Sequence, residues 1–269
     1  MALSRYEYVK NYETDDRCLP SCWIVIRIDG KAFRKFTDAH GYLKPNDDRG
    51  LGLMAKAAQT VMGEFTDIVL AYGQSDEFSF VFHKDCKIYN RRASKLTSNI
   101  VSLFASSFVL YWPQFFGDRE LKYPPTFDSR AVLYPTDNIL KDYLSWRQAD
   151  CHINNLYNTC FWKLVQEKGL SPREAEDVLK STVSENKNEL LFKEFNINYN
   201  NLPELYRKGT VIIRRTKCKK SLDSETQATI QTDTENPANS KRDKTISSIV
   251  LHTDIISSKF WEEHPHILK

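Results

Sequence analysis

The sequence lacks several features that would place it in whole classes of protein. Its 269 residues include only six cysteines, nine glycines and three methionines, and the formal net charge is +3. Cys18 and Cys22 form one close pair, but no second Cys or His pair stands at zinc-finger spacing, which argues against both a structural zinc and a disulfide framework. No apolar run reaches the roughly 20 residues of a membrane-spanning helix. Because the net charge is small, any nucleic-acid surface must come from local basic clusters.

The N-terminal residues carry no recognisable targeting signal. Met1 to Glu7 has neither an apolar signal-peptide core nor an acidic-poor, arginine-rich transit pattern. We therefore expect a soluble intracellular protein with reduced cysteines, in the cytoplasm, the nucleus or both. A mitochondrial location stays open if a targeting segment precedes this sequence. The hydrophobic content of 41% is sufficient for a sizeable core.

The hydrophobic pattern of the first half predicts an α/β fold of the α+β kind. Strands are expected over 23–28, 67–72, 77–82 and 129–134, with helices over 49–65 and 91–112. The order β-α-β-β-α-β is the ferredoxin-like pattern, an antiparallel sheet with helices. In that pattern the first and third strands lie side by side, so the end of one meets the start of the other.

Three carboxylates stand at those strand ends. Asp29 follows the first strand, and Asp76 and Glu77 precede the third. Ionised carboxylates at the ends of apolar strands lose hydration, and close carboxylates are stable as anions when they share divalent cations. Such a cluster suits two-metal phosphoryl or nucleotidyl transfer. Taken singly, Asp29-Gly30 and Ser75-Asp76-Glu77 are also ordinary turn sequences, so the prediction depends on their convergence.

Basic residues follow the same strands, at positions where a triphosphate could bind. The second long helix is expected to begin with cations, although a helix N-terminus already carries partial positive charge. An anionic ligand would relieve this conflict, and a solvated basic face is the alternative. The basic residues are Lys31, Arg34, Lys35, Lys44, Arg91, Arg92 and Lys95.

The second half of the chain is predicted to be mainly helical. We expect one or two helices over 138–168, then helices over 172–184 and 185–195, a loop over 196–201 and a strand over 210–215 that enters a basic run, 214–220. The polar run from His152 to Asn158 either forms a buried network or contacts a ligand. The predicted regions are a catalytic domain with an N-terminal extension (1–136), a helical region with a strand (137–220), a flexible loop (221–245) and a C-terminal segment that docks back (246–269).

Five motifs, in order, closely resemble the eukaryotic tRNA(His) guanylyltransferase family. The resemblance continues to Thr253-Asp-Ile-Ile256 and Phe260-Trp-Glu-Glu-His-Pro265, and so covers nearly the whole chain. The motifs are Arg27-Ile-Asp-Gly30, Tyr72-Gly-Gln-Ser-Asp-Glu77, Arg91-Arg-Ala-Ser-Lys95, Ser145-Trp-Arg-Gln-Ala-Asp-Cys-His-Ile-Asn-Asn-Leu-Tyr-Asn158 and Phe195-Asn-Ile-Asn-Tyr-Asn-Asn201.

The resemblance implies an activity and a fold. Enzymes of this family add a guanosine to the 5′ end of histidine tRNA, in the 3′-to-5′ direction, on a polymerase-like palm. ATP adenylylates the 5′-monophosphate, the 3′-hydroxyl of GTP displaces AMP, and pyrophosphate is then removed. The expected partners are histidine tRNA, ATP, GTP and three further subunits in a homotetramer.

The resemblance also assigns roles to residues of this chain. Asp29, Asp76 and the Gly30 carbonyl would ligate two Mg²⁺ ions, and Glu77 would be a third catalytic carboxylate. GTP would bind along Asp29, Gly30, Lys31, Ala32, Phe33 and Arg34, and at Ser75, Asp76 and Glu77. Further triphosphate contacts would come from Lys44, Arg92 and Lys95, and tRNA contacts from His152, Lys187 and Asn198.

Two other functions share some of these features. Gly73-Gln-Ser-Asp-Glu-Phe78 resembles the Gly-Gly-Asp-Glu-Phe hairpin of diguanylate cyclases, but the second glycine is absent and residues 139–215 have no counterpart there. A non-catalytic RNA-binding protein could instead use the sheet as a platform for stacking bases. Phe78, Phe80 and Phe82 are expected on one face of the sheet, where covering helices would make them core.

Overall fold

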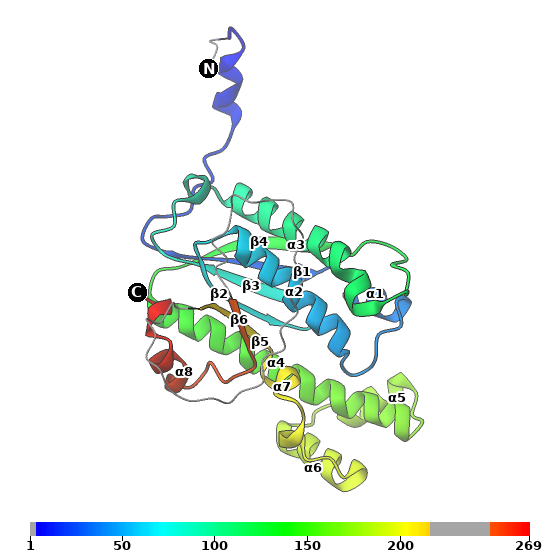
Figure 1. Cartoon of the computed structure of the whole chain (residues 1–269). Helices are drawn as coiled ribbons and strands as arrows, with labels where there is room; N and C mark the ends of the chain where they lie inside the picture. The colour runs from blue at the N-terminus through cyan, green and yellow to red at the C-terminus, as the bar shows by residue number, and fades with distance from the viewer. Residues whose placement is uncertain (1–3, 216–247) are drawn as a thin grey trace, which may run out of the picture.

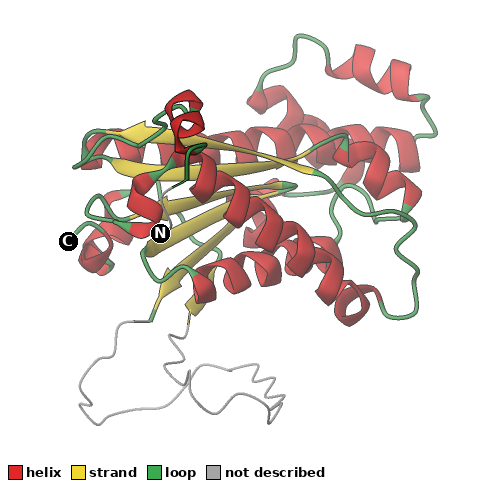
Figure 2. Cartoon of the chain, turned by 90° about the horizontal axis from the view of Figure 1, so that it is seen from above, coloured by secondary structure: helices red, strands yellow, loops and turns green. Residues whose placement is uncertain are grey.

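A six-stranded antiparallel sheet forms the centre of the molecule (Figures 1 and 2). The computed structural model describes residues 4–215 and 248–269. Within them the strand order is β4-β1-β3-β2-β5-β6. The strands are β1 (Trp23–Gly30), β2 (Ile68–Gln74), β3 (Glu77–Phe82), β4 (Phe127–Tyr134), β5 (Thr210–Arg214) and β6 (Ser248–Leu251).

The predicted neighbours in the sheet are confirmed. β1 lies between β3 and β4 and is antiparallel to both. β2 pairs with β3 through the expected hairpin, and β5 and β6 extend the sheet beyond β2. The predicted strand over 210–215 is β5, which ends one residue earlier.

Two long helices cover one face of the sheet. They are α2 (Asp48–Glu64) and α3 (Ala93–Phe116), as predicted, although α3 continues one turn further. Because side chains alternate along a strand, β1 sends Ile24, Ile26 and Ile28 into this layer, and β3 sends its three phenylalanines. The aromatic row of β3 is thus core, as the sequence predicted. The short helix α1 (Phe33–Ala39) follows β1.

The other face is covered by α4 (Asp137–Glu167) and the C-terminal α8 (Ser258–Glu263). The predicted helix over 138–168 is a single helix, and its first half packs on Trp23, Val25 and Val81. The C-terminal segment adds Phe260 and Trp261 to the same layer.

The second half of α4 extends past the sheet and carries a small helical outgrowth (Figure 1). The outgrowth consists of α5 (Pro172–Leu179), α6 (Ser184–Phe195) and the 3₁₀ turn η3 (Tyr199–Asn201), and α7 (Glu204–Lys208) then leads into β5. The predicted capping box at Ser171 and Glu174 starts α5. The predicted range 172–184 is too long, because Ser181 takes a left-handed conformation that helices do not continue through.

Three further 3₁₀ turns occur in the described ranges, and the last of them adds the buried Ile267 to the layer of α4 and α8. They are η1 (Glu7–Tyr12), η2 (Ile88–Arg91) and η4 (Pro265–Ile267). Of the predicted basic run 214–220, only Arg214 and Arg215 belong to the described residues, and the predicted loop 221–245 lies outside them. Among the helices of the described ranges, none combines the length and apolar character needed to cross a bilayer.

The layer between the sheet and α3 should dominate stability. Phe104 is fully buried against Phe78, Phe80 and Phe127, so Phe104→Ala should lower the free energy of unfolding by about 3–5 kcal/mol. Leu110 lies on the same helix with 69% of its surface exposed. Leu110→Ala should therefore change the free energy of unfolding by no more than about 0.5 kcal/mol. Urea unfolding of both variants tests this, and equal losses would contradict the assignment of the core.

Candidate active site

The three predicted carboxylates come together at one end of the sheet. Asp29 on β1 is the direct cross-strand partner of Glu77 on β3. The amide of Gly30 donates to the carbonyl of Asp76 across 3.1 Å. Ser75 and Asp76 form the turn between β2 and β3, and Ser75 has a left-handed φ of +49°. The convergence expected from topology is therefore confirmed.

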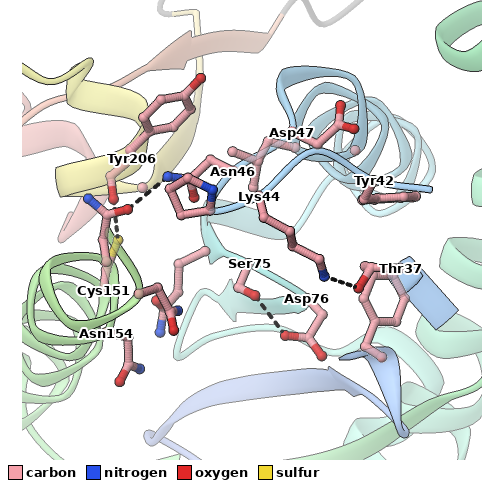
Figure 3. Close-up of a pocket in the computed structure, with 18 of the residues that line it drawn as sticks. Thr37, Tyr42, Lys44, Asn46, Asp47, Ser75, Asp76, Cys151, Asn154 and Tyr206 are labelled. Carbon is pink, nitrogen blue, oxygen red and sulfur yellow. Dashed lines mark hydrogen bonds between the residues drawn. The ribbon is translucent and has the colours of Figure 1, made fainter. Parts of the chain in front are cut away.

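The Asp76 carboxylate is closely surrounded. Ser75 Oγ donates to Asp76 Oδ1 across 3.0 Å (Figure 3). A Cβ added to Gly30 would stand 2.8 Å from Asp76 Oδ2 and 2.6 Å from the Phe33 ring. Only glycine fits at position 30 without displacing these neighbours, so the backbone can approach the carboxylate here.

A cavity of about 540 Å³ opens beside the carboxylates (Figure 3). This volume is within the range of sites for small molecules, roughly 300–1,000 Å³. One wall is formed by the segment after β1, another by α4, and α7 completes the enclosure. Its polar and charged lining includes Asp29, Arg34, Thr37, Lys44, Ser75, Asp76, Glu77, Asp150, Asn154 and Asn158, and its aromatic lining includes Tyr42, Tyr157, Phe161, Trp162 and Tyr206.

The carboxylates are poorly compensated within the protein. Burial, together with the charges of Asp29 and Glu77, raises the pKa of Asp76 to about 6, although the hydrogen bond from Ser75 acts in the opposite direction. Burial also raises the pKa of Asp29, with a contribution from Asp128. Both carboxylates would therefore be stabilised as anions by a cation placed beside them.

The donor set fits a magnesium ion. Mg²⁺ prefers oxygen ligands and is typically held by one or two carboxylates together with water and substrate phosphates. Asp29 and Asp76 provide two such carboxylates at the cavity. Across the described ranges, no three His, Cys, Asp or Glu side chains are grouped closely enough to hold a metal ion by themselves. The site would thus depend on its substrate for the remaining ligands.

Glu77 is held by a residue that the sequence analysis did not single out. Arg147 on α4 donates from one guanidinium nitrogen to Glu77 Oε1 and Oε2, at 3.3 and 3.1 Å. Both side chains are buried. Burial raises the pKa of Glu77, and the Arg147 charge opposes that rise. Arg147 and the cavity-lining Asp150 stand three residues apart within the fourth motif, and that spacing on a predicted helix was the available signal.

The predicted phosphate-binding segment is only partly available for a ligand. Ala32 takes a left-handed conformation and starts α1. The amides of Phe33 and Arg34, in the first turn, donate to no acceptor within the described residues. By contrast, the Lys31 amide donates to the Thr126 carbonyl at 2.8 Å, so it cannot also serve a phosphate without breaking that bond.

Lys44 reaches the cavity from the loop before α2. Its amino group donates to Thr37 Oγ1 at 2.9 Å and forms an ion pair with Asp38 at 2.8 Å (Figure 3). It also lies 5.6 Å from the centre of the Trp162 ring. Lys44 is thus a cation at the cavity wall, as a triphosphate contact requires.

Arg92 and Lys95 do not join the carboxylates. Both residues follow the C-terminal end of β3, whereas Glu77 stands at its N-terminal end. At that far end Arg92 forms a β-bridge with Arg17, which precedes β1. Six strand residues at about 3.3 Å each separate the two ends. Within one chain these two residues lie outside the cavity.

The basic start of α3 is compensated by the protein itself. Asp16 accepts from the Ser94 amide at 2.6 Å and pairs with Arg92 at 3.2 Å. Arg91 donates to the backbone carbonyls of five residues, Cys18, Leu19, Cys22, Lys84 and Cys86. These contacts offset part of the positive charge at the start of α3, and phosphate binding by Arg92 and Lys95 stays a prediction.

Of the predicted tRNA contacts, His152 lies on α4, whereas Lys187 and Asn198 lie on the helical outgrowth, and none of the three belongs to the cavity lining. Asn198 caps η3 by accepting from the Asn200 amide, and Lys187 Nζ donates to the Thr182 carbonyl. The His152 ring packs edge-on against Tyr199 at 5.2 Å.

The polar run 152–158 divides between the two alternatives left by the sequence. Asn155 is buried and links Asn46 to Tyr199, whose hydroxyl donates to the His152 carbonyl. Asn154 and Asn158 line the cavity, and Asn155 contributes to its lining as well. One part of the run is thus a structural network and the other faces any ligand that binds.

Two family models match almost end to end. The model described as tRNAHis guanylyltransferase matches residues 6–135, and the model described as Thg1 C terminal domain matches residues 138–257. The chain belongs to the tRNA(His) guanylyltransferase family. Its members are nucleotidyltransferases, so the predicted enzyme class is confirmed.

Two curated relatives match this chain over nearly their whole length. The probable tRNA(His) guanylyltransferase of Dictyostelium discoideum is 56% identical over 268 residues, which cover 100% of this chain and 99% of that one. The tRNA(His) guanylyltransferase of Schizosaccharomyces pombe is 52% identical over 267 residues, covering 99% and 98% of the two chains.

Solved structures of guanylyltransferases share the fold. The crystal structure from Saccharomyces cerevisiae superposes with a TM-score of 0.74 at 46% identity, covering 78% of this chain and 93% of that one. A bacterial Thg1-like protein in complex with ATP superposes with a TM-score of 0.73 over 98% of this chain and 99% of that one. Its 23% identity supports the fold alone.

The Asp16 contact should make the start of α3 sensitive to acid. Hydrogen bonds from Ser94 hold the pKa of Asp16 at about 2, below its ordinary value of 3.8. A lowered carboxyl pKa stabilises the folded state above about pH 4, and this contribution is lost as the pH falls toward 2. Hydrogen exchange at the Ser94 amide should therefore lose protection over that interval.

The matching variant is Asp16→Asn, which should lower the Ser94 protection factor already at pH 6. Asp15→Asn is the control, because Asp15 is exposed and pairs with Arg17. If Asp16→Asn left Ser94 as protected as in the wild type, the helix start would not depend on this carboxylate.

Proposed function

We propose that this chain is a tRNA(His) guanylyltransferase, which adds a guanosine to the 5′ end of histidine tRNA in the 3′-to-5′ direction. The observation that carries the proposal is the placement of Asp29 and Asp76 side by side in a nucleotide-sized cavity. It is supported by family membership over nearly the whole chain and by full-length relatives that carry this name.

The sheet supports the further proposal of a polymerase-like palm. In a palm, acidic residues at the edge of an antiparallel sheet face the nucleotide, and helices cover the far side. Here β1 and β3 occupy the centre, their carboxylates lie at one end, and α2 and α3 cover one face.

Asp29, Asp76 and the Gly30 carbonyl are the residues that we propose to hold two Mg²⁺ ions. Ions bound there would stabilise charge on the attacking and leaving oxygens of a phosphoryl group. Both carboxylates are partly buried, so water is partly excluded around them and their charges act more strongly on a bound cation. Glu77, held by Arg147, supplies the third carboxylate of the centre.

The rest of the cavity suits a nucleoside triphosphate. The amides of Phe33 and Arg34 stand at the start of α1, and the Arg34 and Lys44 side chains line the same wall. These groups complement phosphate oxygens. Tyr157, Phe161 and Trp162 on α4 offer aromatic surface to a base.

We propose three chemical steps in this site. A 5′-phosphate oxygen of the tRNA attacks the α-phosphorus of ATP, and pyrophosphate leaves. The 3′-oxygen of GTP then attacks the tRNA 5′-phosphorus, and AMP leaves. Water then attacks the α-phosphorus of the new 5′-triphosphate, so that pyrophosphate leaves and a 5′-monophosphate remains.

Histidine tRNA is much larger than the cavity, so it must contact other surfaces. We propose His152 on α4, and Lys187 and Asn198 on the outgrowth, as candidate tRNA contacts, and a homotetramer as the assembly. Arg92 and Lys95 remain proposed triphosphate contacts, although within one chain they lie outside the cavity.

The RNA-platform alternative is disfavoured by burial. Phe78, Phe80 and Phe82 are covered by α2 and α3, and the opposite face of the sheet is covered by α4 and α8. Base stacking on this sheet would require one of these layers to move away. The cyclase alternative makes a different product from GTP alone, and so can be tested directly.

The test is label transfer from GTP to 5′-monophosphorylated histidine tRNA with ATP and Mg²⁺. Wild type should label the tRNA 5′ end, and Asp76→Asn should reduce transfer by about a hundredfold or more, as expected when a group that stabilises transition-state charge is lost. Asp142→Asn, an exposed site on α4, should behave as wild type. A cyclic dinucleotide formed from GTP alone, without tRNA labelling, would contradict the proposal.

A further inference from the structure

The contact between Arg147 and Glu77 is unusual for a merely structural ion pair. Both side chains are buried, with 7% and 12% of their surfaces exposed. Taking two charges out of water costs much of what their attraction returns, and apolar pairs of similar volume are often as stable. Arg147 Nε also has no hydrogen-bond partner within the described residues. Stability alone therefore gives little reason for this pair.

The donors of Arg147 point toward the reactive end of the sheet. One guanidinium nitrogen contacts both oxygens of Glu77 and lies 3.6 Å from Asp150, which lines the cavity. From the other side Gln74 Nε2 donates to both carboxylates, at 3.3 Å to Glu77 and 3.2 Å to Asp150. The two carboxylates are thus bridged twice. Trp146 packs on the guanidinium, with its ring centre 3.3 Å from Arg147 Cζ, and fixes the plane of the group.

This network joins two parts of the site that belong to different layers. Gln74 and Glu77 flank the turn that carries Asp76, whereas Arg147 and Asp150 belong to α4, which forms the opposite wall. No other ion pair within residues 4–215 and 248–269 connects the β2–β3 hairpin to α4. Arg147 thus supplies the ionic part of the contact that orients Glu77 between hairpin and wall, and Gln74 supplies its neutral part.

We propose that Arg147 is a positioning residue for nucleotidyl transfer, acting through Glu77 rather than on the substrate. The inference rests on the proposed function. Arg147 is not among the cavity-lining residues, so it should affect the rate of the chemical steps more than the binding of GTP. Residues that orient a reactive carboxylate in this way typically change activity by about 10–100-fold when removed.

A double-mutant cycle tests the inference. Arg147→Met, Glu77→Gln and the double variant would be compared for kcat and for KM of GTP in the tRNA guanylylation assay, each expressed per folded molecule. Arg147→Met should lower kcat by about 10–100-fold and leave KM for GTP close to the wild-type value. Because Arg147 acts through Glu77, the double variant should be no slower than the slower single variant.

Thermal unfolding separates positioning from folding. Arg147→Met leaves Glu77 as a buried unpaired charge and should lower Tm, whereas the double variant should regain Tm without regaining kcat. Lys141→Met is the matched control. Lys141 is a cation on the same helix, and its amino group lies over the Trp261 ring. Its kcat should equal that of the wild type.

Three results would overturn the inference. Losses of kcat that multiply in the double variant would show that Arg147 acts independently of Glu77. An unchanged kcat per folded Arg147→Met molecule would leave Arg147 a purely structural role. A wild type that transfers no guanosine to tRNA would overturn the proposed function and this inference with it, whereas the first two results require an active wild type and overturn the inference alone.

Discussion

The antiparallel register between β1 and β3 is the constraint on which the rest of the site depends. Ile24, Ile26 and Ile28 must face the apolar layer under α2 and α3, and alternation then turns Asp29 toward the α4 side. A slip of one residue would place Asp29 in that apolar layer and an isoleucine at the site. The same burial that fixes the core therefore fixes the position of the reactive carboxylate.

Four acidic side chains line the cavity, and α4 supplies a cation that offsets part of their charge. Asp29, Asp76, Glu77 and Asp150 all line one cavity, so their mutual repulsion must be offset. Among the described residues, the buried Arg147 neutralises part of this charge on the α4 side, and the charge of Arg27 on β1 also acts on Asp29 and Glu77. Asp29 and Asp76 are left without a comparable partner. This asymmetry separates a structural half of the cluster from a half suited to a bound cation.

The elements that sequence could predict are those set by local pattern. Alternation in the strands, the apolar period of the long helices and the Ser171 capping box each depend on neighbouring residues, and strand order followed from the sequence of elements. The Arg147–Glu77 pair spans 70 residues and depends on where α4 crosses the sheet, which no local pattern encodes. The distance of Arg92 from the carboxylates also escaped local pattern, because a residue just after a strand lies a full strand length from its start.

The size of the cavity also limits how the protein can use it. A space of about 540 Å³ is suited to a nucleotide, whereas any substrate of the size of a tRNA must be recognised elsewhere. The α5–α6 outgrowth is connected to the cavity wall by α4, a single helix of 31 residues. The first half of α4 is tied to β3 by Arg147, and Gln148 ties it to Lys208 on α7 and to Thr253 and Ile255 after β6. A rigid helix anchored at one end and carrying a projecting surface at the other can couple distant recognition to the position of the reactive carboxylates.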